Sequence, residues 1–100
     1  MQEIKNEIRN DIDKGDKVRW KSQAMGIEKE KIGVVLNVIP SGVNAKQFIP
    51  FGTKKSHIKF DTAISRNDRA LVAVAAGKNR NIRHYYTPRL SVLEPIEGQN

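Results

Sequence analysis

An alternation of basic and apolar residues begins at position 17 and constrains the fold more than any other feature. The stretch 17–22, KVRWKS, has a period of two, which places successive side chains on opposite faces of an extended strand. We therefore expect Val18 and Trp20 on a buried face. The alternative is that Trp20, the single tryptophan, is exposed and stacks on bases, but its shared face with Val18 favours packing.

More short segments with strand-forming character follow, separated by glycine, proline and polar residues. The segment 23–31, QAMGIEKEK, predicts a polar connection, and 32–40, IGVVLNVIP, predicts a second strand closed by proline. Gly33 predicts a bulge or a close approach of another backbone, because glycine otherwise weakens a strand. A long loop insertion is expected around 41–69, with a short alternating strand inside it at 56–62, SHIKFDT.

The segment 65–86, SRNDRALVAVAAGKNRNIRHYY, is compatible with two structures. A helix could begin near Asn67 or Asp68 and end at Gly77. The alternative is a hairpin in which 71–75 and 82–86 flank the turn 77–81. The hairpin is preferred, because glycine and asparagine suit the turn and the second arm alternates. The remaining 87–96, TPRLSVLEPI, predicts a tight turn at 87–90 and a short last strand at 91–96.

Together these segments predict a mainly β fold, a small antiparallel barrel of about five strands. Before the first strand, Ile4, Ile8 and Ile12 recur every four residues. That spacing puts them on one face of a helix, so we expect a short N-terminal helix or arm over 1–13.

Two parts of the chain resemble a known family. KGDKVRW at 14–20, followed by EKIGVVLNVIP at 30–40, resembles the KOW motif and the first hairpin of other SH3-like barrels, including Tudor-type domains. YYTPRLSVLEPI at 85–96 looks like the turn and closing strand of the same barrels. The positions that match the family's pattern are Gly15, Asp16, Val18, Gly33, Val34 and Val35. The resemblance implies one SH3-like barrel over 14–97. Such barrels include nucleic-acid-binding and protein-binding members, so fold alone does not select a function.

The positive charge is concentrated in one half of the chain. The net charge is +7, and residues 44–93 hold ten Lys or Arg against two acids, whereas 1–43 hold eight against seven. A field of one sign favours a polyanionic partner, DNA or RNA. No apolar run reaches the roughly 20 residues of a membrane span, and there are no cysteines. We therefore expect a cytoplasmic protein with no membrane partner.

The candidate contacts to nucleic acid are cations and one aromatic ring. Lysine and arginine neutralise phosphates, and a tyrosine face stacks on unpaired bases. The predicted contacts are Lys54 and Lys55 in the long loop, Lys78 and Arg80 in the hairpin turn, and Arg83 and Tyr85 on one face of the following strand. Lys17, Arg19 and Lys21 would extend this basic surface.

Catalysis is not expected, because no serine elbow, metal-ligand spacing or phosphate loop is present. No metal or cofactor is expected either. A second hypothesis is a protein-interaction adaptor whose basic surface meets an acidic partner and whose apolar anchor is 48–51, FIPF. A small accessory or inhibitor protein, as a phage or mobile element would encode, is a variant of that hypothesis.

Overall fold

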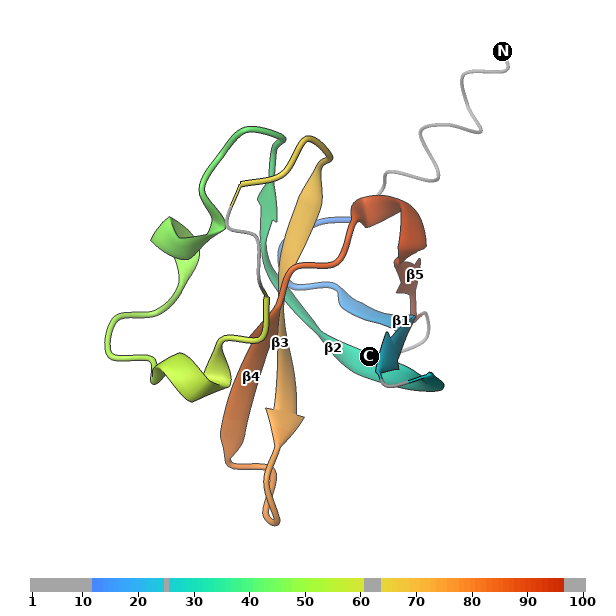
Figure 1. The fold of residues 1–100 in the computed structure, drawn as a ribbon, viewed down its shortest axis with the longest axis vertical. Coiled ribbons are helices and arrows are strands. Elements are labelled where there is room, and N and C mark those ends of the chain that lie inside the picture. The colour runs from blue at the N-terminus through green and yellow to red at the C-terminus, as the bar shows by residue number, and fades with distance from the viewer. Residues whose placement is uncertain (1–11, 25, 61–63, 97–100) are drawn as a thin grey trace.

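The structure, a computed structural model, describes residues 12–24, 26–60 and 64–96. One antiparallel sheet in the order β4-β3-β2-β1-β5 forms its centre (Figure 1). The strands are β1 (Lys17–Ala24), β2 (Ile27–Ile39), β3 (Arg69–Ala76), β4 (Ile82–Tyr86) and β5 (Glu94–Pro95). Three short 3-10 helices accompany them: η1 (Ala45–Phe48), η2 (Lys55–His57) and η3 (Leu90–Val92). The predicted mainly β fold of five antiparallel strands is confirmed.

The predicted closure of the sheet into a barrel is not found. Within the described ranges, the strand pairing ends at β4 on one side and at β5 on the other. β5 pairs with β1 through two residues. The outer edge of β4 is partly occupied by the long loop, because Ile58 bridges Tyr85 and the N–H of Lys59 donates to the Tyr85 carbonyl at 2.8 Å. Because β5 has only two residues and the loop partly occupies the outer edge of β4, no ladder of backbone hydrogen bonds joins β4 to β5 in the described residues.

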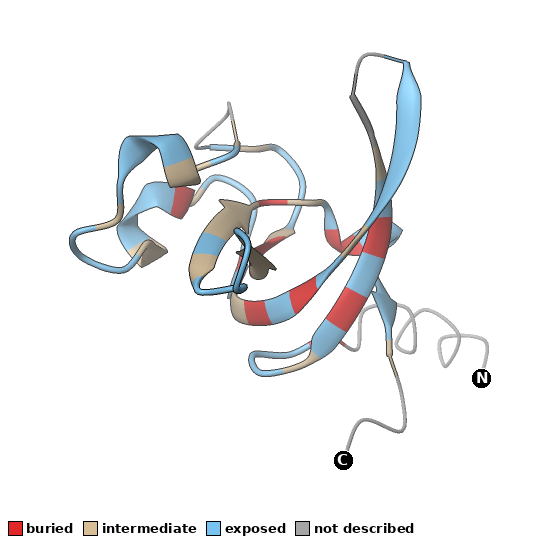
Figure 2. Ribbon diagram, turned by 90° about the horizontal axis from the view of Figure 1, so that it is seen from below, coloured by how far each residue is buried: buried red, intermediate tan, exposed pale blue. Residues whose placement is uncertain are grey.

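The first hairpin is longer than predicted. β1 and β2 pair without a break from Lys17↔Val34 to Ala24↔Ile27, so 27–31 belong to a strand and the predicted polar connection is wrong. Residues 26–30 are exposed, and this end of the hairpin projects from the core (Figure 2). Because neither face meets the core there, the strand does not need an apolar alternation.

Gly33 lies where β2 passes closely over β3. A Cβ atom at this position would lie 2.5 Å from the carbonyl oxygen of Ala73 and 2.7 Å from Cγ1 of Val72. Two residues further on, the register between β2 and β3 shifts between Val35 and Asn37. The predicted close backbone approach at Gly33 is therefore confirmed, and the bulge lies just after it.

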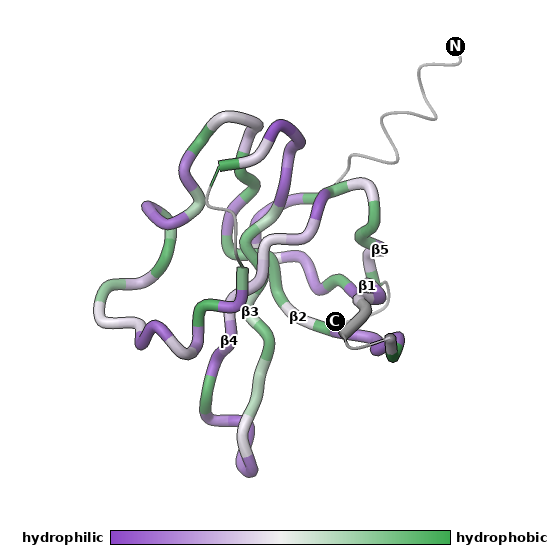
Figure 3. Tube along the Cα trace, in the orientation of Figure 1, coloured by the Kyte–Doolittle hydropathy of each residue, from purple (hydrophilic) through white to green (hydrophobic). Residues whose placement is uncertain are grey.

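Two hydrophobic clusters hold the sheet, and β3 contributes to both. Its Ala70 and Val72 belong to the first cluster, and Leu71 between them belongs to the second. The first cluster is Ile12, Val18, Trp20, Val35, Ala70, Val72, Leu90 and Leu93. The second is Ile39, Ala45 and Leu71, onto which Leu36, Val43, Phe48, Phe60 and Tyr85 pack. Apolar residues accordingly follow β2 and β3, whereas the tip of the β3–β4 hairpin is hydrophilic (Figure 3).

The structure confirms one of the remaining predictions for secondary structure and corrects two others. The hairpin preferred over 71–86 is confirmed by the pairing of β3 with β4. The strand predicted at 56–62 is wrong, because η2 occupies its start and a single bridge at Ile58 follows. The turn predicted at 87–90 is displaced to η3, which leaves β5 only two residues. The N-terminal helix or arm falls mainly on 1–11, outside the described residues; Ile12 itself lies in the first cluster.

Candidate nucleic-acid interface

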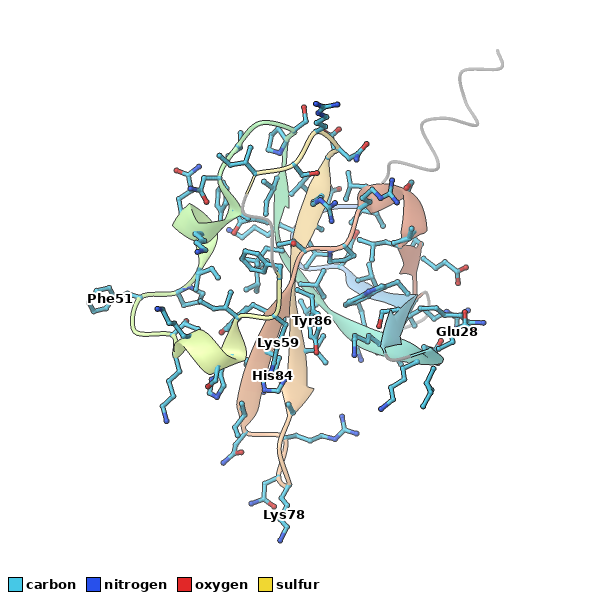
Figure 4. The ribbon with its side chains drawn as sticks, in the orientation of Figure 1. Glu28, Phe51, Lys59, Lys78, His84 and Tyr86 are labelled. Carbon is cyan, nitrogen blue, oxygen red and sulfur yellow. The ribbon has the colours of Figure 1, made fainter. Side chains whose placement is uncertain are left out.

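The tip of the β3–β4 hairpin carries two of the predicted contacts, Lys78 and Arg80. The backbone reverses at Gly77, with φ of 88°, and at Arg80, with φ of 56°. The N–H of Arg80 donates to the carbonyl of Gly77 at 3.2 Å. Lys78 lies at the extreme end of the hairpin (Figure 4). The turn therefore presents two cations to solvent.

Arg83 connects this tip to the body of β4. Its Nη1 atom donates to the carbonyl of Arg80 at 3.0 Å, which links the side chain to the turn. A guanidinium has five N–H donors, so this bond leaves donors for a second, anionic acceptor.

The segment 50–57 lies beside β4 and is shaped by local turn chemistry. The carbonyl of Pro50 accepts from the N–H of Thr53 at 3.3 Å and from its hydroxyl at 2.7 Å. Residues 50–53 form a β-turn, and Gly52 at its third position has a φ of 87°. A positive φ at that position favours glycine. Phe51 therefore stands at the outward corner of the turn, and it is fully exposed. Figure 4 shows it pointing away from the molecule.

A groove of about 400 Å³ separates this segment from β4. Loop residues on its wall include Phe51, Lys54 and His57, and strand residues include Ile82, Arg83 and Tyr85. Three predicted contacts, Lys54, Arg83 and Tyr85, thus lie around one groove although Lys54 is far from the other two in sequence. The Tyr85 ring also packs onto the second hydrophobic cluster, so it is half-buried.

A second group of basic side chains lies beside β4, and His57 belongs both to this group and to the wall of the groove. The His57 and His84 rings are 5.4 Å apart, and the ammonium of Lys31 lies 4.9 Å from the centre of the Tyr86 ring. Partial burial, and then repulsion from Lys59, His57 and Lys31, lowers the pKa of His84 below its ordinary value of 6.5. Figure 4 shows the side chains of Tyr86, Lys59 and His84 close together beside β4.

Sequence reasoning did not assign this second group to the interface. No histidine is among the contacts predicted from the sequence, and Lys31 falls in the predicted connection 23–31. The alternation of Ile82, His84 and Tyr86 on one strand face was a usable signal. No signal in the sequence pointed to Lys31, because its position beside Tyr86 depends on β2 extending back to Ile27.

Near this group, a cavity of about 280 Å³ is lined by Lys59, Phe60, Arg69 and Tyr86, among others. Trp20 forms part of its wall but is 6% exposed. Arg69 donates through Nη1 to the carbonyl of Thr87 at 2.7 Å. The Trp20 ring is thus a wall of the core, as the alternation predicted, rather than an exposed platform.

The cations of β1 have different surroundings from those of β4. Arg19 donates through Nε to Glu94 at 3.2 Å and lies 3.9 Å from Glu30. Lys21 faces Glu30 across the hairpin. A cavity lined by Arg19, Lys21, Glu30 and Glu94 therefore carries both signs of charge. Lys17 is exposed at the start of the same strand. Two strands separate β1 from β4 in the sheet, so the structure does not join these cations to the groove.

Lys55, the remaining predicted contact, is exposed at the start of η2. It follows Lys54 directly, but it is not one of the residues that line the groove.

Within the described parts of the chain, no three His, Cys, Asp or Glu residues are grouped as a metal site would require. No helix there is long and apolar enough to cross a membrane. No protein-family model, curated protein or solved structure matches the chain.

Proposed function

We propose that this chain is a non-enzymatic nucleic-acid-binding module of the SH3-like, KOW or Tudor type, which binds phosphates with the cations around β4. The resemblance over 14–40 covers the hairpin of β1 and β2, and the resemblance over 85–96 covers the end of β4, η3 and β5. Gly33, one of the matching positions, is required by the contact with β3.

The observation that carries the functional proposal is a set of cations without counter-charges. Lys54, Lys78, Arg80 and Arg83 make no ion pair with any carboxylate of the described residues, whereas Arg19 meets two. The four lie in the groove and at the hairpin tip. Exposed cations left unpaired in a segment of net charge +8 are available to phosphates and release counterions when they bind them.

The adaptor, or small inhibitor, remains the alternative, and Phe51 is the observation in its favour. A fully exposed phenylalanine can anchor a protein partner. However, Phe48 packs onto the second cluster and Ile49 is half-buried. The FIPF segment therefore offers a partner one ring rather than the three apolar side chains that the adaptor hypothesis requires.

The test is an anisotropy titration against labelled single- and double-stranded DNA and RNA over a salt series. We expect log K to fall linearly with log salt concentration. The double variant Lys78→Ala/Arg80→Ala should reduce the slope by about two, or one per phosphate contact. The matched control is Lys14→Ala/Lys29→Ala, which removes the same charge from exposed positions away from β4 and should leave the slope near its original value. Absence of binding to every nucleic acid at low salt would refute the proposal.

A further inference from the structure

Phe51 differs from every other aromatic residue of the chain in its exposure. The other five are buried or half-buried: Trp20, Phe48, Phe60, Tyr85 and Tyr86. Trp20 and Tyr86 contact each other, and Lys31 covers the Tyr86 ring. Phe51 alone therefore offers an open aromatic face, and the turn at Pro50–Thr53 holds it outward.

The basic residues near Phe51 favour a ligand that carries both an anionic group and a flat ring. Lys54 lies three residues after it and borders the same groove, whose other wall includes Arg83 and Tyr85 on β4. The Phe51 ring itself points outward at the rim of the groove (Figure 4). None of the described residues that line the groove is acidic. The groove has a volume of about 400 Å³ and is open to solvent.

We propose that an unpaired nucleotide of a single-stranded nucleic acid binds at the rim of this groove, with its base stacked on the outward-pointing ring of Phe51 and the adjoining phosphates held by Lys54 and Arg83 in the groove. This inference rests on the proposed function and specifies its ligand. An aromatic side chain can stack on a base only when the face of the base is accessible, and in a duplex the neighbouring pairs cover both faces. Cations beside the ring then track the backbone, which is the arrangement of single-strand-binding surfaces.

Arg83 fits this role although its guanidinium already bonds to the carbonyl of Arg80 through Nη1. That bond fixes the orientation of a long side chain before any ligand arrives, which lowers the entropy lost on binding. The remaining donors of the guanidinium form a planar fork suited to phosphate oxygens.

The experiment compares a fluorescein-labelled oligothymidylate with a mixed-sequence duplex of equal length, using wild type, Phe51→Ala and Phe51→Trp. We expect Phe51→Ala to weaken single-strand binding by about 5- to 150-fold, which corresponds to 1–3 kcal/mol per stacked base. Duplex binding and the salt slope should not change, because no charge is removed. Phe51→Trp should retain binding, and its added fluorescence should be quenched by the single strand and not by the duplex.

Ile64→Ala is the matched control, because Ile64 is also exposed and apolar, and does not line the groove. It should bind both ligands as wild type does. Circular dichroism should show all the variants folded, since each substituted side chain lies at the surface.

The possible failures are distinguishable. Wild type that binds nucleic acid, with Phe51→Ala binding the single strand equally well, would overturn the stacking inference and leave the proposed function standing. Equal weakening on single strand and duplex would overturn it as well, because the ring would then not select unpaired bases. Wild type that binds neither ligand at low salt would overturn both the inference and the proposed function.

Discussion

The rings of Trp20 and Tyr86 meet edge to face, with centroids 5.9 Å apart and planes inclined at 68°. Trp20 comes from β1 and Tyr86 from the end of β4, so this contact joins two strands that are not neighbours in the sheet. The two rings pack with the first hydrophobic cluster. The side chains therefore connect β1 and β4 through the core, although the two strands are not joined by backbone hydrogen bonds.

Trp20→Ala should lower the free energy of unfolding by about 3–5 kcal/mol, because it removes a buried ring and leaves a cavity. Urea unfolding followed by circular dichroism measures the change. Phe51→Ala, which removes an exposed ring, should stay within about 0.5 kcal/mol of wild type. If Trp20→Ala kept wild-type stability and lost nucleic-acid binding, the ring would be a stacking residue instead.

Gly33→Ala should destabilise the fold by about 1–3 kcal/mol, the usual cost of overpacking. The added methyl would meet the carbonyl oxygen of Ala73 and the side chain of Val72, and a backbone atom of the sheet cannot move aside easily. Urea midpoints for this variant and for Lys29→Ala, an exposed position of the same strand, give the comparison. A midpoint equal to wild type would mean that β2 and β3 are less closely packed at Gly33.

Arg80→Gly should stabilise the protein by about 0.5–1 kcal/mol. Arg80 has a φ of 56°, a conformation that costs a residue with a Cβ atom roughly 1–2 kcal/mol. Glycine avoids this cost but loses more backbone entropy on folding. Lys78→Gly is the matched control in the same turn: it removes the same charge at ordinary φ, so it should be neutral or destabilising. Equal stabilities of the two variants would contradict this prediction.

His84 should make stability depend on pH below neutrality. Its folded pKa lies below 6.5, so the unfolded chain takes up a proton at a higher pH than the folded chain does. The contribution of His84 to the free energy of unfolding is complete above pH 6.5, and it is lost as the pH falls from 6.5 towards the folded pKa. An NMR titration of the His84 ring measures that pKa, and Lys59→Gln should move it towards 6.5 because a repelling charge is removed. An unchanged pKa in Lys59→Gln would exclude this electrostatic cause.

Strands whose side chains meet the core were predictable from the sequence. Val18 and Trp20 alternate with cations because one face of β1 is buried, and the hairpin of β3 and β4 shows β-branched residues, a glycine turn and an alternating second arm. The segment 27–31 was not predictable by the same reasoning. It is held in β2 by pairing with β1 beyond the core, where burial imposes no pattern on the sequence.

For the candidate site, the sequence by itself determined that the chain is mainly β and that its cations are concentrated in 44–93, because charge and periodicity are local properties. The tertiary structure decided which cations act together. Lys54 and Arg83 lie around one groove because the loop is hydrogen-bonded to β4 through Lys59 and Tyr85. Arg19 is countered by Glu94 because β5 pairs with β1. Both results depend on contacts between residues distant in sequence, and no local pattern encodes which strand edge a loop or a two-residue strand will occupy.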